Sequence, residues 1–254
     1  RPVWPGRPER AGALSMFDPA RHRCVLFDVD GTIAETEGQA HLPAFNRALE
    51  EAGLPWRWSR DDYKRLLKTA GGFERLLRFA QESGNDPEVL AEALKKVHVA
   101  KNRHFADILA AGAVKPREGF GELVLALARN NIAWGVVTTT SRSNWNALWT
   151  HSLAPLHLPP PVVVIVGEDV SEKKPDPEAY QLALERLRLT ARQACAIEDS
   201  RNGMIAARMA GLPVAIVRSE FFGDERFDEA AVVVDELTEL IDVLEDAART
   251  VRSA

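Results

Sequence analysis

The segment that decides the fold reads Arg23-Cys24-Val25-Leu26-Phe27-Asp28-Val29-Asp30-Gly31-Thr32. Its apolar run, residues 24–27, stops abruptly at two aspartates and a glycine. A short and continuous apolar run is typical of a parallel strand buried on both faces, and the polar residues after it are typical of a functional loop. We therefore predict a buried strand that ends in a polar site.

Two kinds of pattern follow this strand. Residues 37–111 carry apolar residues at helical spacing, with breaks at Gly53-Leu54-Pro55, at Gly71-Gly72 and at residues 84–87. After residue 112 helices and strands alternate. The pattern predicts helices over residues 119–130, 143–150, 177–188, 201–210 and 236–250, and strands over residues 132–138, 162–166, 194–197, 213–217 and 232–234.

This alternation is typical of an α/β fold, a doubly wound parallel sheet with helices on both faces. We predict a Rossmann-like core of residues 21–36 and 113–254, interrupted by an inserted all-helical cap of residues 37–112. Residues 1–20 begin with three prolines and almost no apolar periodicity, so we expect a disordered tail there. We expect Met16 to be the natural start.

Composition excludes several classes of protein. The 254 residues are 46% hydrophobic and 27% charged, with a net charge of −5 and no Lys/Arg run in a predicted element. These values are ordinary for a soluble globular domain, and they lack the basic surface that binds nucleic acid. The longest apolar stretch, residues 159–166, is too short to span a bilayer. We expect a cytoplasmic protein, monomeric or weakly dimeric, with no nucleic-acid or membrane partner.

The two cysteines, Cys24 and Cys195, each lie in an apolar run that reads as a buried strand, which suits a reducing compartment and does not suit a zinc site. Each precedes an aspartate, Asp28 or Asp199, by four residues and should share its side of the strand. If the two aspartates meet at one metal ion, the two thiols should be neighbours, with no disulfide between them.

Polar residues follow four of the predicted strands. Asp28 and Asp30 follow the first, and Thr139, Lys174 and Asp199 follow later ones. Ligands of such sheets bind beyond the carboxyl ends of the strands, so these groups should meet. Three carboxylates repel one another unless a hard cation lies between them, and oxygen ligands suit Mg²⁺. The threonine and the lysine add an anion site, and the whole set predicts a phosphate site.

These residues resemble a known family. Asp28-Val29-Asp30-Gly31-Thr32, Thr138-Thr139-Thr140-Ser141, Lys173-Lys174-Pro175 and Ile197-Glu198-Asp199-Ser200 are similar to the four motifs of the haloacid dehalogenase-like hydrolases, in order. The helical insertion resembles the four-helix cap of the β-phosphoglucomutase-like subgroup. Within that subgroup, the chain looks most like the CbbY-like sugar-phosphate phosphatases.

The resemblance implies a role for each core residue. Asp28 would attack phosphorus and become an aspartyl-phosphate, and Asp30 would protonate the leaving oxygen and later activate water. Asp28, the Asp30 backbone carbonyl, Asp199 and Glu198, the last through water, would hold Mg²⁺. Thr139 and Lys174 would bind the transferring phosphoryl group.

The resemblance also implies substrate contacts from the cap side, by Glu37, His41, Arg75 and Lys101, with Thr140 on the core. Other interpretations stay open. Arg75 and Lys101 could be solvated helix charges, His41 could be structural, and Glu37 could be a first-turn glutamate favoured by the helix dipole. The chain also departs from the family pattern, because Phe73 follows Gly71-Gly72 where relatives carry a lysine.

The function expected from the resemblance is a Mg²⁺-dependent phosphatase of a small phosphorylated sugar, with xylulose 1,5-bisphosphate as the leading substrate. A sugar-phosphate mutase is the alternative among enzymes, and Thr32 favours the phosphatase because the mutases often carry valine there. A catalytically silent protein that binds a phosphorylated metabolite is the alternative outside enzymes. The presence of Asp28, Asp30, Lys174 and Asp199 argues against it.

Overall fold

The computed structural model describes residues 16–252. Six parallel strands form one sheet in the order β3-β2-β1-β4-β5-β6. The strands are β1 (Cys24–Phe27), β2 (Ala133–Val137), β3 (Val164–Ile165), β4 (Ala194–Glu198), β5 (Val214–Val217) and β6 (Val232–Val234). Because the strand order changes direction on either side of β1, a ligand crevice is expected at its carboxyl end.

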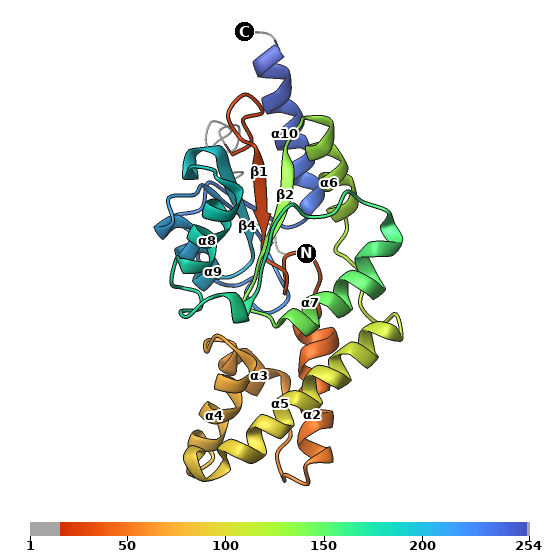
Figure 1. Cartoon of the computed structure of the whole chain (residues 1–254), viewed down its shortest axis with the longest axis vertical. Helices are drawn as coiled ribbons and strands as arrows, with labels where there is room; N and C mark the ends of the chain where they lie inside the picture. Colours follow the sequence, from red (N-terminus) through yellow and green to blue (C-terminus); the bar gives the residue numbers. More distant parts are fainter. Residues whose placement is uncertain (1–15, 253–254) are drawn as a thin grey trace.

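Helices cover both faces of the sheet, as the α/β prediction requires (Figure 1). The helices α6 (Phe120–Arg129), α7 (Arg142–Leu148) and α10 (Leu237–Arg252) pack on one face, and α8 (Glu178–Leu187) and α9 (Arg201–Met209) pack on the other. Alternate residues of β1 face the two layers: Val25 and Phe27 face the first, and Cys24 and Leu26 face the second. The predicted fold class is confirmed.

A separate group of helices lies beyond the carboxyl ends of the strands (Figure 1). It consists of a π-helical turn η1 (Glu37–His41) and the helices α2 (Leu42–Glu51), α3 (Arg60–Leu66), α4 (Gly72–Glu82) and α5 (Pro87–Ala110). We call this group the cap. It has an apolar cluster that includes the fully buried rings of Phe45 and Tyr63, while the end of α5, with Phe105 and Leu109, packs into the main core. One core segment enters the cap cluster, because Phe221, which follows β5, packs among its residues.

Some predicted elements differ in length. The strand expected over residues 162–166 is only Val164–Ile165, because it lies at the sheet edge and three prolines precede it. The helix expected over residues 143–150 ends at Leu148 and continues as a π-helical turn, Trp149–Leu153 (η2). Short 3₁₀ turns that were not predicted lie at Ala154–Leu156 (η3), Gly167–Asp169 (η4) and Ala191–Gln193 (η5).

The expected tail of residues 1–20 is wrong at its C-terminal end. Met16 and Phe17 are fully buried in the core layer that contains α6 and α10. Burial of two large apolar side chains is favourable, and this fixes the segment against the sheet. The rest of the expected tail, residues 1–15, lies outside the described residues. Among the helices that the structure describes, none is long and apolar enough to cross a membrane.

The two cysteines lie on the neighbouring strands β1 and β4, but the expectation that their thiols share one side of the sheet is wrong. In the register of β1 and β4, Cys24 lies opposite Ala194, and Val25 lies opposite Cys195. The cysteines are therefore offset by one residue, and a shift of one residue turns a side chain to the other face of the sheet. Cys24 faces the layer of α8 and α9, whereas Cys195 faces the other layer. Both thiols are free and buried.

The packing of β1 generates a stability prediction. The ring of Phe27 is fully buried and makes edge contacts with Phe120 and Trp134, with centroid distances of 5.7 and 6.0 Å. We expect Phe27→Ala to lower the free energy of unfolding by about 3–5 kcal/mol through lost contacts and a cavity. Val99 on α5 is 68% exposed, so Val99→Ala should change it by less than about 0.5 kcal/mol. Equal shifts of the two variants in urea denaturation would contradict this packing.

Candidate active site

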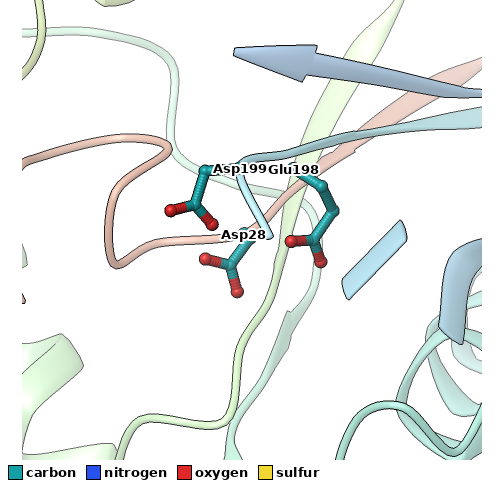
Figure 2. A group of neighbouring side chains, drawn as sticks. All are labelled: Asp28, Glu198 and Asp199. Atoms are coloured by element: carbon teal, nitrogen blue, oxygen red, sulfur yellow. The ribbon is translucent and has the colours of Figure 1, made fainter. Parts of the chain in front are cut away.

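Three buried carboxylates meet at the ends of two neighbouring strands (Figure 2). Asp28 follows β1, Glu198 ends β4 and Asp199 follows it. One carboxylate oxygen of each lies within 4.8 Å of the others. Phe27 pairs with Ile197 and the Asp28 N–H donates to the Ile197 carbonyl, so the register brings Asp28 level with Glu198. Asp199 lies one residue beyond β4, so its side chain need not point to the face opposite Glu198.

Lys174 holds two of these carboxylates together. Its Nζ donates to Asp28 Oδ1 at 2.7 Å, to Glu198 Oε1 at 2.6 Å and to the Val137 carbonyl at 2.7 Å. Burial alone would lower the pKa of Lys174, but the two carboxylates raise it above its ordinary value. Burial raises the pKa of Asp28 to about 6, while Lys174 acts in the opposite direction. The lysine therefore favours an ionised Asp28.

The donor set fits a hard divalent cation. Among the described residues, the buried oxygens Glu198 Oε2 and Asp199 Oδ2 have no hydrogen-bond partner. Burial and the neighbouring carboxylates raise the pKa of Asp199 well above its ordinary value, so this group needs a compensating positive charge to ionise. Two of these carboxylates also pack directly against glycines. A Cβ at Gly31 would overlap Asp199, and a Cβ at Gly203 would overlap Glu198.

The expectation that the Asp30 carboxylate joins those of Asp28 and Asp199 is wrong, because Glu198 lies in the cluster and Asp30 points to other partners. Its carboxylate accepts a hydrogen bond from the Thr36 hydroxyl and lies 3.1 Å from His41 Nε2. The His41 ring stacks on Phe105 with centroids 4.3 Å apart. Burial raises the pKa of Asp30 and lowers that of His41 well below its ordinary value. The side chain of Asp30 therefore faces the cap and is available for proton transfer, while its backbone carbonyl as a metal ligand stays a prediction.

Glu37 and Arg75 form a buried pair. Arg75 Nη2 lies 3.6 Å from Glu37 Oε1, and the Tyr63 hydroxyl donates to Glu37 and accepts from Arg75. Only 11% of the Arg75 side chain is exposed. Arg75 is therefore not a solvated helix charge, and its charge is already balanced by Glu37.

Lys101 is the second buried cation of the cap side. It is 2% exposed, and its Nζ lies 5.1 Å from the ring centroid of Phe45 and 5.2 Å from that of Phe105. Its Nζ donates a hydrogen bond to Asn102 Oδ1 at 3.4 Å. Lys101 is thus not a solvated helix charge either. Burial lowers its pKa to about 7, opposed by Glu37 and Asp30.

The predicted substrate residues share one cleft. Glu37, His41, Arg75, Lys101, Thr139 and Thr140 all line it together with Asp30. A second cleft, lined by Asp28, Lys174 and Asp199, shares Asp30, Glu37, Arg75 and Thr139 with the first. The Thr140 hydroxyl accepts from Asn144, at 3.3 Å. The structure therefore brings the core motifs and the cap candidates to one place.

Several residues of the site were not predicted. The Tyr180 hydroxyl donates to Glu198 Oε1 at 2.6 Å, and Tyr63 links Glu37 to Arg75. Both tyrosines fit the apolar faces of their helices, so their spacing gives no sign of a polar role. Lys173, beside Lys174, forms an ion pair with Glu74 of the cap. No local signal links two residues so far apart in the chain.

Comparison with known proteins identifies the family. A family profile described as haloacid dehalogenase-like hydrolase matches residues 22–211. The chain belongs to the haloacid dehalogenase-like hydrolases. The motif resemblance found in the sequence is thereby confirmed.

Individual relatives cover almost the same stretch of the chain. The chain is 38% identical to "Protein CbbY" of Cereibacter sphaeroides, over 85% of this chain and 93% of the relative. It is 30% identical to "Phosphorylated carbohydrates phosphatase" of Thermotoga maritima, over 87% of this chain and 98% of the relative. A crystal structure of mutant CbbY from Rhodobacter sphaeroides in complex with xylulose-(1,5)bisphosphate is 36% identical, with a TM-score of 0.78, and covers 86% of this chain and 96% of that one.

The pKa of Lys101 generates a pH prediction. Below pH 7 the amine carries its charge and should attract a phosphate group, and above pH 7 it loses that charge. At pH 6 we expect the KM of Lys101→Gln for a sugar phosphate to exceed the wild-type KM by about tenfold. This factor corresponds to the binding free energy of one charge-assisted hydrogen bond. The ratio should fall toward one above pH 8. Lys96→Gln, at an exposed position of α5, is the control, and a ratio that does not change with pH would contradict the assignment.

Proposed function

We propose that this protein is a Mg²⁺-dependent phosphatase that hydrolyses a small sugar phosphate through an aspartyl-phosphate at Asp28, with xylulose 1,5-bisphosphate as the leading substrate. One observation carries the proposal. Lys174 joins Asp28 to Glu198 beside two unpartnered carboxylate oxygens, and a cleft that contains Asp30 and the cap cations opens next to them. The sugar phosphate bound by the similar CbbY structure supports the substrate class.

Asp28 and Asp30 divide the chemistry. A carboxylate oxygen of Asp28 attacks phosphorus, and the bond from phosphorus to the sugar oxygen breaks. Asp30 gives its proton to that leaving oxygen, so that the sugar departs as an alcohol. Asp30 then takes a proton from the water that attacks the aspartyl-phosphate, which releases inorganic phosphate and restores Asp28. The raised pKa of Asp30 suits a group that must carry a proton in one step and accept one in the next.

The remaining core residues stabilise charge and hold the site. Lys174 neutralises negative charge near Asp28, and Thr139 lines the cleft beside the phosphoryl site. When bound, Mg²⁺ would supply further positive charge for the transferring phosphoryl oxygens, held by Asp28 and Asp199, by Glu198 through water and by the Asp30 carbonyl. Tyr180 fixes Glu198 Oε1, which leaves Oε2 free for such a role.

The cap side would select the sugar. Glu37 and His41 can bond to sugar hydroxyls, and Thr140 lines the same cleft from the core. For a substrate with a second phosphate, Lys101 is the strongest candidate, because Arg75 is already paired with Glu37 and Lys173 with Glu74. Phe73 also lines this cleft, at the position where the family resemblance leads us to expect a lysine. Preference for a bisphosphate therefore depends mainly on Lys101.

The function can be tested by phosphate release. With Mg²⁺ and a panel of sugar mono- and bisphosphates, we expect xylulose 1,5-bisphosphate to have the highest kcat/KM. Asp28→Asn should lower kcat by about 10³-fold or more, because the nucleophile is lost. Asp228→Asn, an exposed aspartate paired with Arg226, is the matched control and should leave kcat unchanged.

The possible outcomes separate the parts of the proposal. Broad, weak phosphate release from monophosphates that is abolished in Asp28→Asn would support the phosphatase activity but contradict a bisphosphate as the preferred substrate. Phosphate release that survives in Asp28→Asn would overturn the nucleophile itself.

A further inference from the structure

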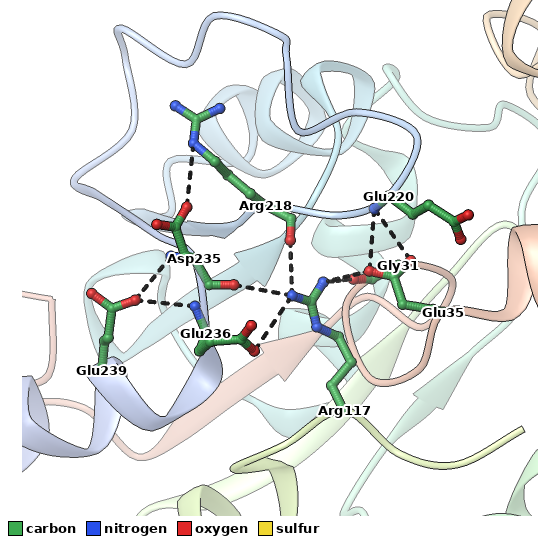
Figure 3. A network of polar contacts seen from close by, with 8 residues as sticks. All are labelled: Gly31, Glu35, Arg117, Arg218, Glu220, Asp235, Glu236 and Glu239. Atoms are coloured by element: carbon green, nitrogen blue, oxygen red, sulfur yellow. Dashed lines mark hydrogen bonds and ion pairs between the residues drawn. The ribbon is translucent and has the colours of Figure 1, made fainter. Parts of the chain in front are cut away.

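Arg117 lies outside the active-site cleft and outside the family motifs, yet its guanidinium makes several hydrogen bonds (Figure 3). Its side chain is 8% exposed. Its Nη1 donates to the Gly31 carbonyl at 2.7 Å and to Glu35 at 3.0 Å, and its Nη2 donates to the carbonyls of Arg218 at 2.8 Å and Asp235 at 3.1 Å. A guanidinium is the side chain that can serve several acceptors in fixed directions.

The acceptors belong to segments that are far apart in the chain. Gly31 follows Asp30 in the loop after β1, and Glu35 lies on the chain that leads from that loop into the cap. Arg218 follows β5, and Asp235 follows β6. Arg117 itself lies on the chain that returns from the cap, and its N–H donates to the Ile33 carbonyl at 2.8 Å. One side chain thus ties both connections of the cap to two strand ends.

The bond to Gly31 bears directly on Asp30. Gly31 has a φ of +91°, which only glycine adopts readily, and its N–H donates to the Ala34 carbonyl at 2.8 Å. Its α-carbon packs so closely on Asp199 that no Cβ fits. With its N–H, its α-carbon and its carbonyl all held, this residue has little freedom, and it fixes the direction in which Asp30 leaves the backbone.

Glu35 extends the same network toward the cap. Its carboxylate also accepts from the Glu220 N–H at 3.2 Å. The Glu220 carboxylate forms an ion pair with Arg60 of α3, and the next residue, Phe221, makes an edge contact with Tyr63 at 5.7 Å. Tyr63 in turn donates to Glu37. The bonds of Arg117 therefore continue, through Glu35 and the segment after β5, to the cap side of the cleft.

We infer that Arg117 is a positioning residue for proton transfer by Asp30: it fixes the loop of residues 28–35 so that the Asp30 carboxylate faces the leaving group under the cap. The inference rests on the proposed function, because it concerns the acid of that reaction. Arg117 touches neither substrate nor metal ligand side chains and acts through the Gly31 carbonyl and Glu35. Lysine would keep the charge but could not serve the same acceptors.

The test compares substrates whose leaving groups differ in their need for a proton. A sugar alkoxide must be protonated as it leaves, whereas p-nitrophenolate is a stable anion that leaves without an acid. We expect Arg117→Lys to lower kcat for xylulose 1,5-bisphosphate or glucose 6-phosphate by about tenfold or more, within the range of general acid catalysis, and kcat for p-nitrophenyl phosphate by less than about threefold. Glu35→Gln should shift the ratio in the same direction by a smaller amount.

Glu236→Gln is the matched control. Glu236 lies 3.9 Å from the same guanidinium and is 54% exposed, so its loss should leave both activities and their ratio unchanged. Thermal unfolding of each variant shows whether the variant is folded. If Arg117→Lys does not fold, Glu35→Gln provides the test.

Selective loss of the sugar-phosphate activity supports the inference. An equal loss on both substrates, or no loss on either, overturns it. If wild-type protein hydrolyses p-nitrophenyl phosphate but no sugar phosphate, the proposed substrate class fails, and phenyl phosphate then replaces the sugar as the substrate with the poorer leaving group.

Discussion

The ammonium group of Lys174 stands between the carboxylates of Asp28 and Glu198, and the rest of the structure is arranged around this buried contact. Several buried charges within a few ångströms are costly unless they are paired and fully bonded. Lys174 reduces that cost for two carboxylates, while one oxygen of Asp199, Oδ2, and the second oxygen of Glu198, Oε2, have no hydrogen-bond partner within the described part of the chain. The balance of charge is therefore incomplete in the protein alone, which is what a cation site requires.

The parallel sheet makes this contact possible. The register of β1 and β4 sets Asp28 level with Glu198, and Lys174 reaches both from the loop before α8. Asp30 is only two residues from Asp28, yet it lies among Thr36 and His41 instead of the acidic cluster. The turn at Gly31 and the bonds of Arg117 account for this separation. One short loop thus presents two aspartates to two different environments, one for attack on phosphorus and one for proton transfer.

The sequence was informative where the physical signal is local. Strands buried on both faces and helices with one apolar face were predicted from residue type and spacing, and so was the convergence of Asp28, Lys174 and Asp199, because parallel strands end at one edge. Contacts that depend on strand register or on segments distant in the chain were not predicted. The offset of Cys24 from Cys195 is a matter of one residue, and Tyr63, Tyr180 and Arg117 act through bonds to distant parts of the chain that no spacing reveals.

The role of Asp28 as the nucleophile is tested most directly by identifying the residue that carries the phosphoryl group during turnover. Wild-type protein would be mixed with Mg²⁺ and a sugar phosphate labelled at the reacting phosphate, quenched with acid within one turnover, digested and analysed by mass spectrometry. We expect an acid-stable label that hydroxylamine removes, on the peptide that contains Asp28. A label on another residue, or turnover without a labelled peptide, would contradict the assignment of Asp28 as the nucleophile.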